Sequence, residues 1–83
     1  MRIIFAFRSK TQTLKFYEDL RRFGYECSVI NTPQEINFGC SLSVCTTESA
    51  LHGAKERIKR LGLNTFKGVY VNKSGKYERI YLV

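Results

Sequence analysis

Long apolar segments are missing from this sequence of 83 residues. A membrane-spanning helix needs about 20 consecutive apolar residues, and no run in the chain approaches that length. The opening segment, MRIIFAFRSK, contains one apolar run of five residues, which is shorter than the roughly 7–15 residues of a secretory h-region. We therefore expect a cytoplasmic protein that has no membrane partner.

The sequence also lacks an even set of cysteines and a cluster of histidines. Cys27, Cys40 and Cys45 are odd in number and cannot form a fully paired disulfide framework, so in a reducing cytosol all of them should be thiols. The only histidine, His52, could serve Cys40 or Cys45 as a base, but no spacing requires this, and a surface or boundary position is the simpler interpretation. The spacing of the cysteines also differs from that of structural zinc sites, and no glycine-rich phosphate loop is present. We expect no metal site and no cofactor.

Acidic residues are scarce relative to basic ones. The chain has 14 Lys and Arg against 7 Asp and Glu, which gives a net charge of +7 and a pI of about 9.6. Such a balance favours an anionic partner, for example nucleic acid or an acidic protein. It is equally compatible with a solvated basic surface that binds nothing.

Hydrophobic periodicity predicts one α+β domain over residues 1–83. The expected strands are residues 2–8, 25–31, 41–46, 65–72 and 76–83, and the expected helices are residues 11–23 and a segment capped by Thr46 or Thr47 and closed by Gly62. This order, β-α-β-β-α-β with an additional C-terminal hairpin strand, is that of a ferredoxin-like sandwich with both helices on one face of an antiparallel sheet.

Apolar residues at intervals of three or four predict the buried face of each helix. These residues are Leu14, Tyr17, Leu20 and Phe23 in the first helix and Leu51, Ala54, Ile58 and Leu61 in the second. Ser9 and Thr11 are candidate N-caps for the first helix. Gly75 in the NKSG segment can supply the positive φ that a hairpin turn needs.

The outer face of the second helix is basic, and RNA or an acidic protein would be a suitable partner for it. Its cations are Lys55, Arg57, Lys59 and Arg60. In the RNA-recognition version of this fold, aromatic side chains on the two central strands stack on bases. Phe5 and Phe7 could do so, but both are also explained as core residues, and the strand over residues 41–46 has no aromatic residue.

The segment NTPQEINFGCSL, residues 31–42, places a cysteine at the end of a polar loop. Pro33 ends the preceding strand, and Gly39 and Ser41 put little bulk around Cys40. Loops held by a rigid scaffold often present reactive groups, and a thiol in a basic protein can be activated as a thiolate. We therefore interpret Cys40 as a candidate reactive thiol, with a small apolar filler as the alternative. Cys27 and Cys45 lie within expected strands and are interpreted as small buried hydrophobes.

The same loop resembles the signature of the selenium/sulfur carrier protein-like domain family, a family of small bacterial domains. The segment TPQEINFGCSLSV is similar to that family's loop, which reads approximately Thr-Pro-Arg-Glu-Ile-Ser-x-x-Cys-Gly. The resemblance also includes the opening strand, the helix ending at Gly24 and the Gly-Val-Tyr pattern at residues 68–70, and it covers about residues 2–72. The chain differs from the family's loop at Gln34, at residues 37–39 and at Ser41.

The resemblance implies a function for the loop. Thr32, Pro33, Glu35 and Ile36 occupy motif positions, and Cys40 is the implied carrier thiol, holding sulfur or selenium as a persulfide or selenopersulfide. Gly39 lies outside the matching positions, and we expect it to support the loop by adopting a backbone conformation that other residues avoid. Such a carrier needs no cofactor, because the proteins that donate and accept the sulfur or selenium supply the chemistry. The alternative is a non-catalytic module that binds RNA or an acidic protein through the basic helix face.

Overall fold

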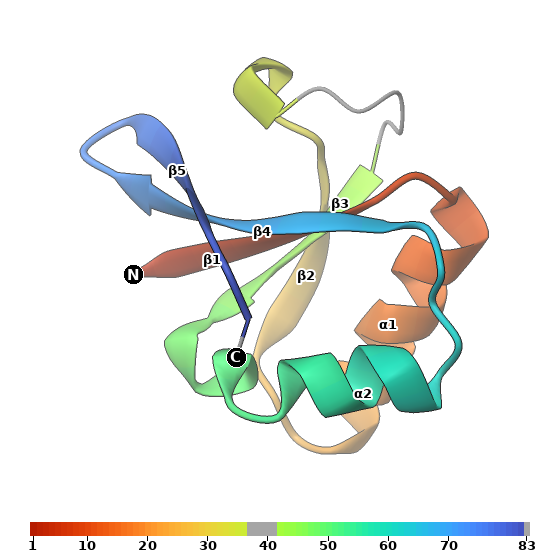
Figure 1. Cartoon of the computed structure of the whole chain (residues 1–83). Helices are drawn as coiled ribbons and strands as arrows, with labels where there is room; N and C mark the ends of the chain where they lie inside the picture. The colour runs from red at the N-terminus through yellow and green to blue at the C-terminus, as the bar shows by residue number, and fades with distance from the viewer. Residues whose placement is uncertain (37–41, 83) are drawn as a thin grey trace.

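The computed structural model describes residues 1–36 and 42–82 (Figure 1). The strands are β1 (Arg2–Phe7), β2 (Cys27–Asn31), β3 (Leu42–Thr47), β4 (Phe66–Lys73) and β5 (Lys76–Ile80), the helices are α1 (Lys10–Arg22) and α2 (Ala54–Arg60), and the 3-10 turns are η1 (Gln34–Ile36) and η2 (Glu48–Leu51). No helix in the described part of the chain is long and apolar enough to cross a membrane.

The strands form one antiparallel sheet of five strands in the order β2-β3-β1-β4-β5. β1 is central because it pairs with β3 on one side and β4 on the other. β5 returns along β4 and forms the edge of the sheet, so β4 is an inner strand. The α+β class predicted from the sequence is therefore confirmed.

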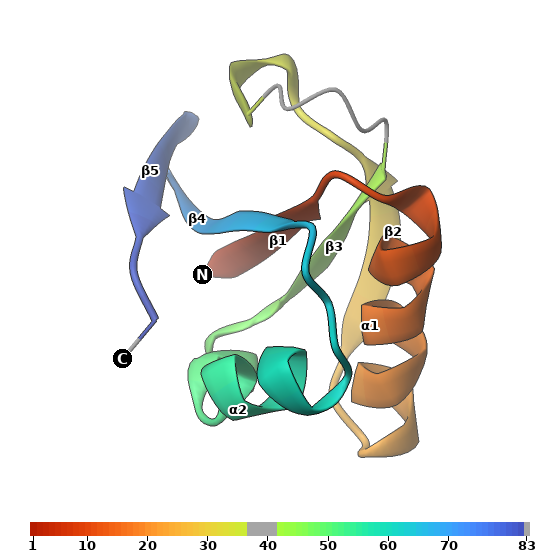
Figure 2. The ribbon, with the colours of Figure 1, turned by 45° about the vertical axis from the view of Figure 1, so that its right-hand side comes forward.

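Both helices cover the same face of the sheet, as Figure 2 shows. The core on this side joins β1 to both helices, with Phe5, Phe16 and Leu20 completely buried and Ile58 9% exposed. The rings of Phe5 and Phe16 lie 4.8 Å apart between their centroids. This packing confirms that the helices share one face, as the order of elements predicts.

The opposite face of the sheet carries no helix and is called the helix-free face below. It carries Ile4, Ala6, Cys45 and Tyr70, which form a second buried cluster with Ile36 of η1. Successive residues of a strand point to opposite faces, so Ile4 and Ala6 face this side while Phe5 faces the helices. The 3-10 turn η1 therefore packs on the helix-free face through Ile36.

The structure corrects the predicted buried face of α1. Ser9 caps the helix as expected, with its Oγ accepting a hydrogen bond from the Gln12 backbone N–H at 3.2 Å. Leu14 and Phe23, however, are 39% and 59% exposed. Steps of three residues fall about 60° short of a full turn each, so a series of such steps moves around the helix instead of following one face.

The structure also divides the second predicted helix into two pieces. The 3-10 turn η2 ends at Leu51, and Gly53 adopts φ +74° before α2 begins at Ala54. A residue in the left-handed conformation cannot continue a right-handed α-helix. The prediction of one continuous helix between the cap at Thr46 or Thr47 and Gly62 was therefore wrong. Ala54 and Ile58 still provide the buried positions of α2.

The β4–β5 hairpin turns as the sequence predicts. Ser74 and Gly75 both have positive φ, at +52° and +83°, and lie between the paired residues Lys73 and Lys76. Two consecutive residues with positive φ are typical of the type I′ turn that joins twisted strands. The Asn72 side-chain oxygen accepts the Gly75 N–H at 3.1 Å and supports the turn.

Candidate functional site

The first half of the motif loop is fastened to the sheet. Thr32 Oγ1 shares a hydrogen bond of 2.7 Å with Ser43 Oγ of β3, and the Ile36 N–H donates to the Pro33 carbonyl at 2.9 Å. Ile36 is only 1% exposed, whereas Gln34 and Glu35 are exposed. Of the predicted site residues, Thr32, Pro33 and Ile36 therefore act together as an anchor for the loop.

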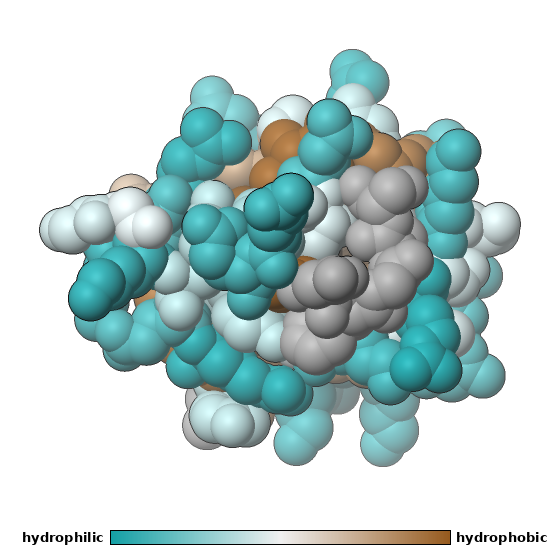
Figure 3. All heavy atoms as spheres, turned by 90° about the horizontal axis from the view of Figure 1, so that it is seen from above, coloured by the Kyte–Doolittle hydropathy of each residue, from teal (hydrophilic) through white to brown (hydrophobic). Residues whose placement is uncertain are grey.

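The predicted carrier thiol, Cys40, and the supporting Gly39 lie outside the described residues, as do the other positions between 37 and 41. The role of Cys40 therefore stays a prediction from the sequence motif. Seen from the end of the molecule where η1 lies, hydrophilic residues cover most of the surface and a few hydrophobic residues show between them (Figure 3).

Cys27 faces the helices and is a poor candidate for sulfur chemistry. Its Sγ is a weak donor to the Tyr17 carbonyl oxygen at 3.8 Å, and the side chain packs beside the core of the helix side. Burial raises the pKa of the Cys27 thiol, and the nearby Arg21 offsets part of this rise. Since the thiolate is the nucleophile, Cys27 has little nucleophilic form at neutral pH.

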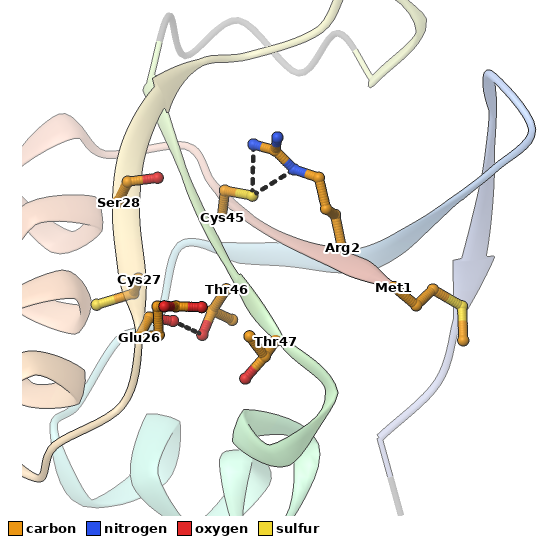
Figure 4. A pocket seen from close by; sticks show the side chains of 8 residues that line it. All are labelled: Met1, Arg2, Glu26, Cys27, Ser28, Cys45, Thr46 and Thr47. Carbon is orange, nitrogen blue, oxygen red and sulfur yellow. Dashed lines mark hydrogen bonds between the residues drawn. The ribbon is translucent and has the colours of Figure 1, made fainter.

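Cys45 faces the opposite side of the sheet and is buried, with 6% of its surface exposed. The Arg2 guanidinium donates two hydrogen bonds to its Sγ, from Nε at 3.2 Å and from Nη2 at 3.0 Å (Figure 4). Cys45 also lines a cavity of about 400 Å³, together with Arg2 and Ser28. The sequence interpretation of Cys45 as a buried residue is confirmed, but it did not identify Arg2 as a partner of the sulfur.

The residues of the predicted basic face divide into two groups. Arg57 and Arg60 both donate to Oδ2 of Asp19 on α1, at 2.5 Å and 3.1 Å. The Arg57 side chain is only 13% exposed and lies over the Phe23 ring at 4.9 Å. Lys55 and Lys59 are exposed on α2. Arg57 is thus mainly part of the contact between the two helices, which the sequence analysis did not anticipate because it gave no role to Asp19.

The described residues do not form a stacking platform for RNA on β1. Phe5 and Phe7 are 0% and 1% exposed and belong to the core between the sheet and the helices. In the RNA-recognition arrangement the stacking aromatics lie on the open face of the sheet. The interpretation of both residues as core is confirmed.

His52 is exposed at the end of η2. Over residues 1–36 and 42–82, no group of three or more His, Cys, Asp and Glu side chains could hold a metal ion.

Comparison with known proteins identifies the family to which the chain belongs. Residues 2–70 match the sequence profile of the family described as "Putative Se/S carrier protein-like". No curated protein and no solved structure matches the chain. The matched segment runs from β1 into β4 and includes the complete motif loop, so the chain belongs to the Se/S carrier protein-like family.

Proposed function

We propose that this protein carries sulfur or selenium on Cys40, as a persulfide or selenopersulfide. The observation that supports this most strongly is the family match over residues 2–70, which includes the loop with Thr32, Pro33, Glu35, Ile36 and Cys40. The family description names the cargo, and Cys40 is the cysteine of the family's loop signature. Partners are then proteins that donate and accept sulfur or selenium.

The anchored start of the loop supports this role. Thr32 is bound to Ser43, and Ile36 is inserted among Ile4, Ala6 and Tyr70. The carrier thiol follows Ile36 by four positions. A loop fastened to a rigid sheet can hold a reactive group at a constant place for incoming partners.

The other two thiols are less suitable for exchange with a protein partner. Cys27 points toward α1 and its pKa is raised by burial, and Cys45 is 6% exposed beneath Arg2. A protein donor must bring its own sulfur into contact with the accepting thiolate. Cys40 is therefore our candidate for exchange between proteins.

The transfer proceeds by thiol–disulfide exchange. The Cys40 thiolate attacks the outer sulfur of a donor persulfide, a new S–S bond forms at Cys40, and the donor leaves as a thiolate. An acceptor thiolate then attacks the outer sulfur held on Cys40 and restores the free thiolate. Neither step involves net oxidation or reduction, so the protein needs no redox cofactor for the transfer.

We further propose that the fold is a ferredoxin-like sandwich to which β5 adds a hairpin strand. The two helices on one face and the strand order β2-β3-β1-β4 within the sheet support this assignment. The extra strand lies beyond the segment that matches the family.

The alternative function is a basic module that binds RNA or an acidic protein. Exposed Lys55, Lys59 and Arg60 support it, but Asp19 neutralises part of the charge of Arg60 and Arg57. This alternative hypothesis accounts for the net charge of +7, but it gives the motif loop no role.

The carrier proposal is tested by finding which cysteine accepts sulfur. The full chain is incubated with glutathione persulfide, excess donor is removed, free and persulfide thiols are blocked with iodoacetamide, and the peptides are analysed by mass spectrometry. We expect one additional sulfur atom on the peptide that contains Cys40. Cys40→Ser should lose this product and keep its circular dichroism spectrum, while Cys27→Ser, the matched control, should keep both. An unmodified Cys40 in the folded protein contradicts the proposal.

A further inference from the structure

Arg2 and Cys45 form a cation–thiol pair on the helix-free face. Arg2 is the first residue of β1, and Cys45 lies on β3 directly opposite Ile4. Side chains two positions apart share a face of a strand, so Arg2 and Ile4 lie on the side of the sheet to which Cys45 points. Figure 4 shows the guanidinium directed at the sulfur, with both hydrogen bonds drawn.

The sulfur is the only hydrogen-bond acceptor that the described residues offer to the Arg2 guanidinium, and none of their carboxylates lies within ion-pair distance of it. A guanidinium is always charged and is suited to anions. Hydrogen bonds from a cation to a charged acceptor are about twice as strong as neutral ones. The pair is therefore arranged to stabilise negative charge on sulfur.

A cavity of about 400 Å³ opens beside the pair and gives a small molecule room to reach it. Cys45, Arg2 and the exposed Ser28 line it, and Ser28 is directly opposite Cys45 in the β2–β3 pairing. Glu26 is the carboxylate among the lining residues, and it is exposed. A nucleophilic atom, a free cation and an accessible space thus lie together on the wall of one cavity.

We propose that Arg2 and Cys45 form a second thiol site that accepts sulfane sulfur from small anionic donors, of which inorganic polysulfide is the probe. The choice of sulfane sulfur as cargo rests on the proposed function, but the site does not depend on Cys40. Arg2 attracts the anionic donor to the cavity and stabilises the charge on sulfur before and after the transfer. The buried position of Cys45 excludes protein donors and selects small ones.

The reaction needs no added oxidant. The Cys45 thiolate attacks a terminal sulfur of the tetrasulfide dianion, and a bond forms between that sulfur and Sγ. The S–S bond next to the attacked sulfur breaks, and its electron pair leaves with the trisulfide dianion. Cys45 then holds a persulfide anion, which accepts the same guanidinium donors.

Cys27 supplies an internal control, because it lies on the neighbouring strand but on the other face. Cys27 is also one of the residues that line the cavity, but its sulfur points toward α1 (Figure 4), and burial raises the pKa of its thiol. Cys27 is only partly buried whereas Cys45 is buried, so accessibility alone would favour modification of Cys27. A site built on Arg2 modifies Cys45 first and depends on the guanidinium.

The test uses Cys40→Ser as the parent, so that the result is independent of the carrier thiol. The parent is treated with sodium tetrasulfide, samples are blocked with iodoacetamide at intervals, and the sulfur gained by the peptides of Cys27 and Cys45 is followed by mass spectrometry. We expect Cys45 to be modified first. Adding Arg2→Met should slow its modification about tenfold, the effect of losing charge-assisted hydrogen bonds, and Arg2→Lys should restore part of the rate. Adding Cys45→Ser should remove the product.

Equal rates of Cys45 modification in the parent and in the variant that adds Arg2→Met would overturn the proposal. Modification of Cys27 before Cys45 would overturn it as well. Thermal unfolding of each variant shows whether Cys45 was probed in a folded chain, and Arg2→Lys gives a second comparison in which a cation is retained. The two proposals fail separately. A chain that takes sulfur at Cys40 but not at Cys45 keeps the carrier function without the second site, and the reverse result keeps the second site alone.

Discussion

Cys27 and Cys45 lie on adjacent strands, yet their sulfurs face opposite sides of the sheet. Cys27 pairs with Thr46 and Cys45 pairs with Ser28, so the two cysteines are offset by one residue in the register. An offset of one residue reverses the face to which a side chain points. One sulfur therefore meets the core and a carbonyl oxygen, and the other meets a guanidinium and a cavity.

The setting of Cys27 predicts how its alkylation depends on pH. Burial raises the pKa of this thiol, so its thiolate forms at higher pH in the folded protein than in the unfolded chain. We expect the rate of iodoacetamide labelling at Cys27 to rise at a higher pH in buffer than in concentrated urea, measured by peptide mass spectrometry. Coincident pH profiles in the two conditions would show that the fold does not shield Cys27.

At the level of the helices, one buried carboxylate joins α1 to α2. Asp19 is 5% exposed and accepts hydrogen bonds from Arg57 and Arg60, and Arg57 also lies over the rings of Phe23 and Tyr25. α2 has only 7 residues, too few for a helix to be stable by itself. The position of α2 therefore depends on the burial of Ile58 in the core and on the ion pairs of Arg57 and Arg60 with Asp19.

Asp19→Asn should therefore destabilise the protein. The substitution leaves Arg57 with a neutral partner in a mostly buried place, and loss of one member of a buried pair typically costs about 3 kcal/mol. Urea denaturation should show a lower free energy of unfolding for Asp19→Asn. Glu18→Gln, which removes an exposed charge from the same helix, is the matched control and should change stability little. Equal denaturation midpoints for the two variants would show that Asp19 does not hold α2.

The sequence predicted the positions of the helices, strands and turns more accurately than it predicted which of their residues are buried. Ser9 as a cap and Gly75 in the hairpin turn are local signals, and both were correct. Leu14 was assigned to the core and is 39% exposed, because the intervals of three residues in α1 drift around the helix. Phe16 and Thr13, which are completely buried, were missed for the same reason. The break at Gly53 could have been anticipated from the glycine, but a 3-10 turn beside it depends on tertiary packing.

The candidate site, too, could be predicted from sequence only in part. The motif around Thr32, Pro33 and Ile36 is continuous in sequence, and it was found there. The pair of Arg2 and Cys45 joins residues that are 43 positions apart. Alternation within each strand indicates the face, but only the pairing of β1 with β3 brings the two side chains together.

For the molecule as a whole, the excess of basic residues has to be compared with the faces that the fold presents. The chain has a net charge of +7, whereas Phe5 and Phe7, the aromatics that could have stacked on bases, are buried against the helices. Positive charge without stacking aromatics on β1 favours binding that is electrostatic and insensitive to sequence.

We therefore expect single-stranded RNA to bind weakly, and only at low salt. Fluorescence anisotropy with a labelled oligonucleotide should show a steep loss of affinity as salt rises and little difference between base compositions. Changing both Lys55 and Lys59 to Glu should abolish this binding, because both side chains are exposed on α2. Binding that persists at physiological salt and prefers one sequence would instead favour the alternative function.

The central claim concerns a complete cycle of the carrier, in which Cys40 both accepts sulfur and gives it up. The most direct measurement is peptide mass spectrometry of the full chain after loading with glutathione persulfide, and again after a small thiol acceptor has been added to the purified product. The account predicts one additional sulfur on the Cys40 peptide after loading, its loss on addition of the thiol, and no such product at position 40 in Cys40→Ser. A folded protein whose Cys40 takes no sulfur, or holds it without releasing it to the thiol, would contradict the account.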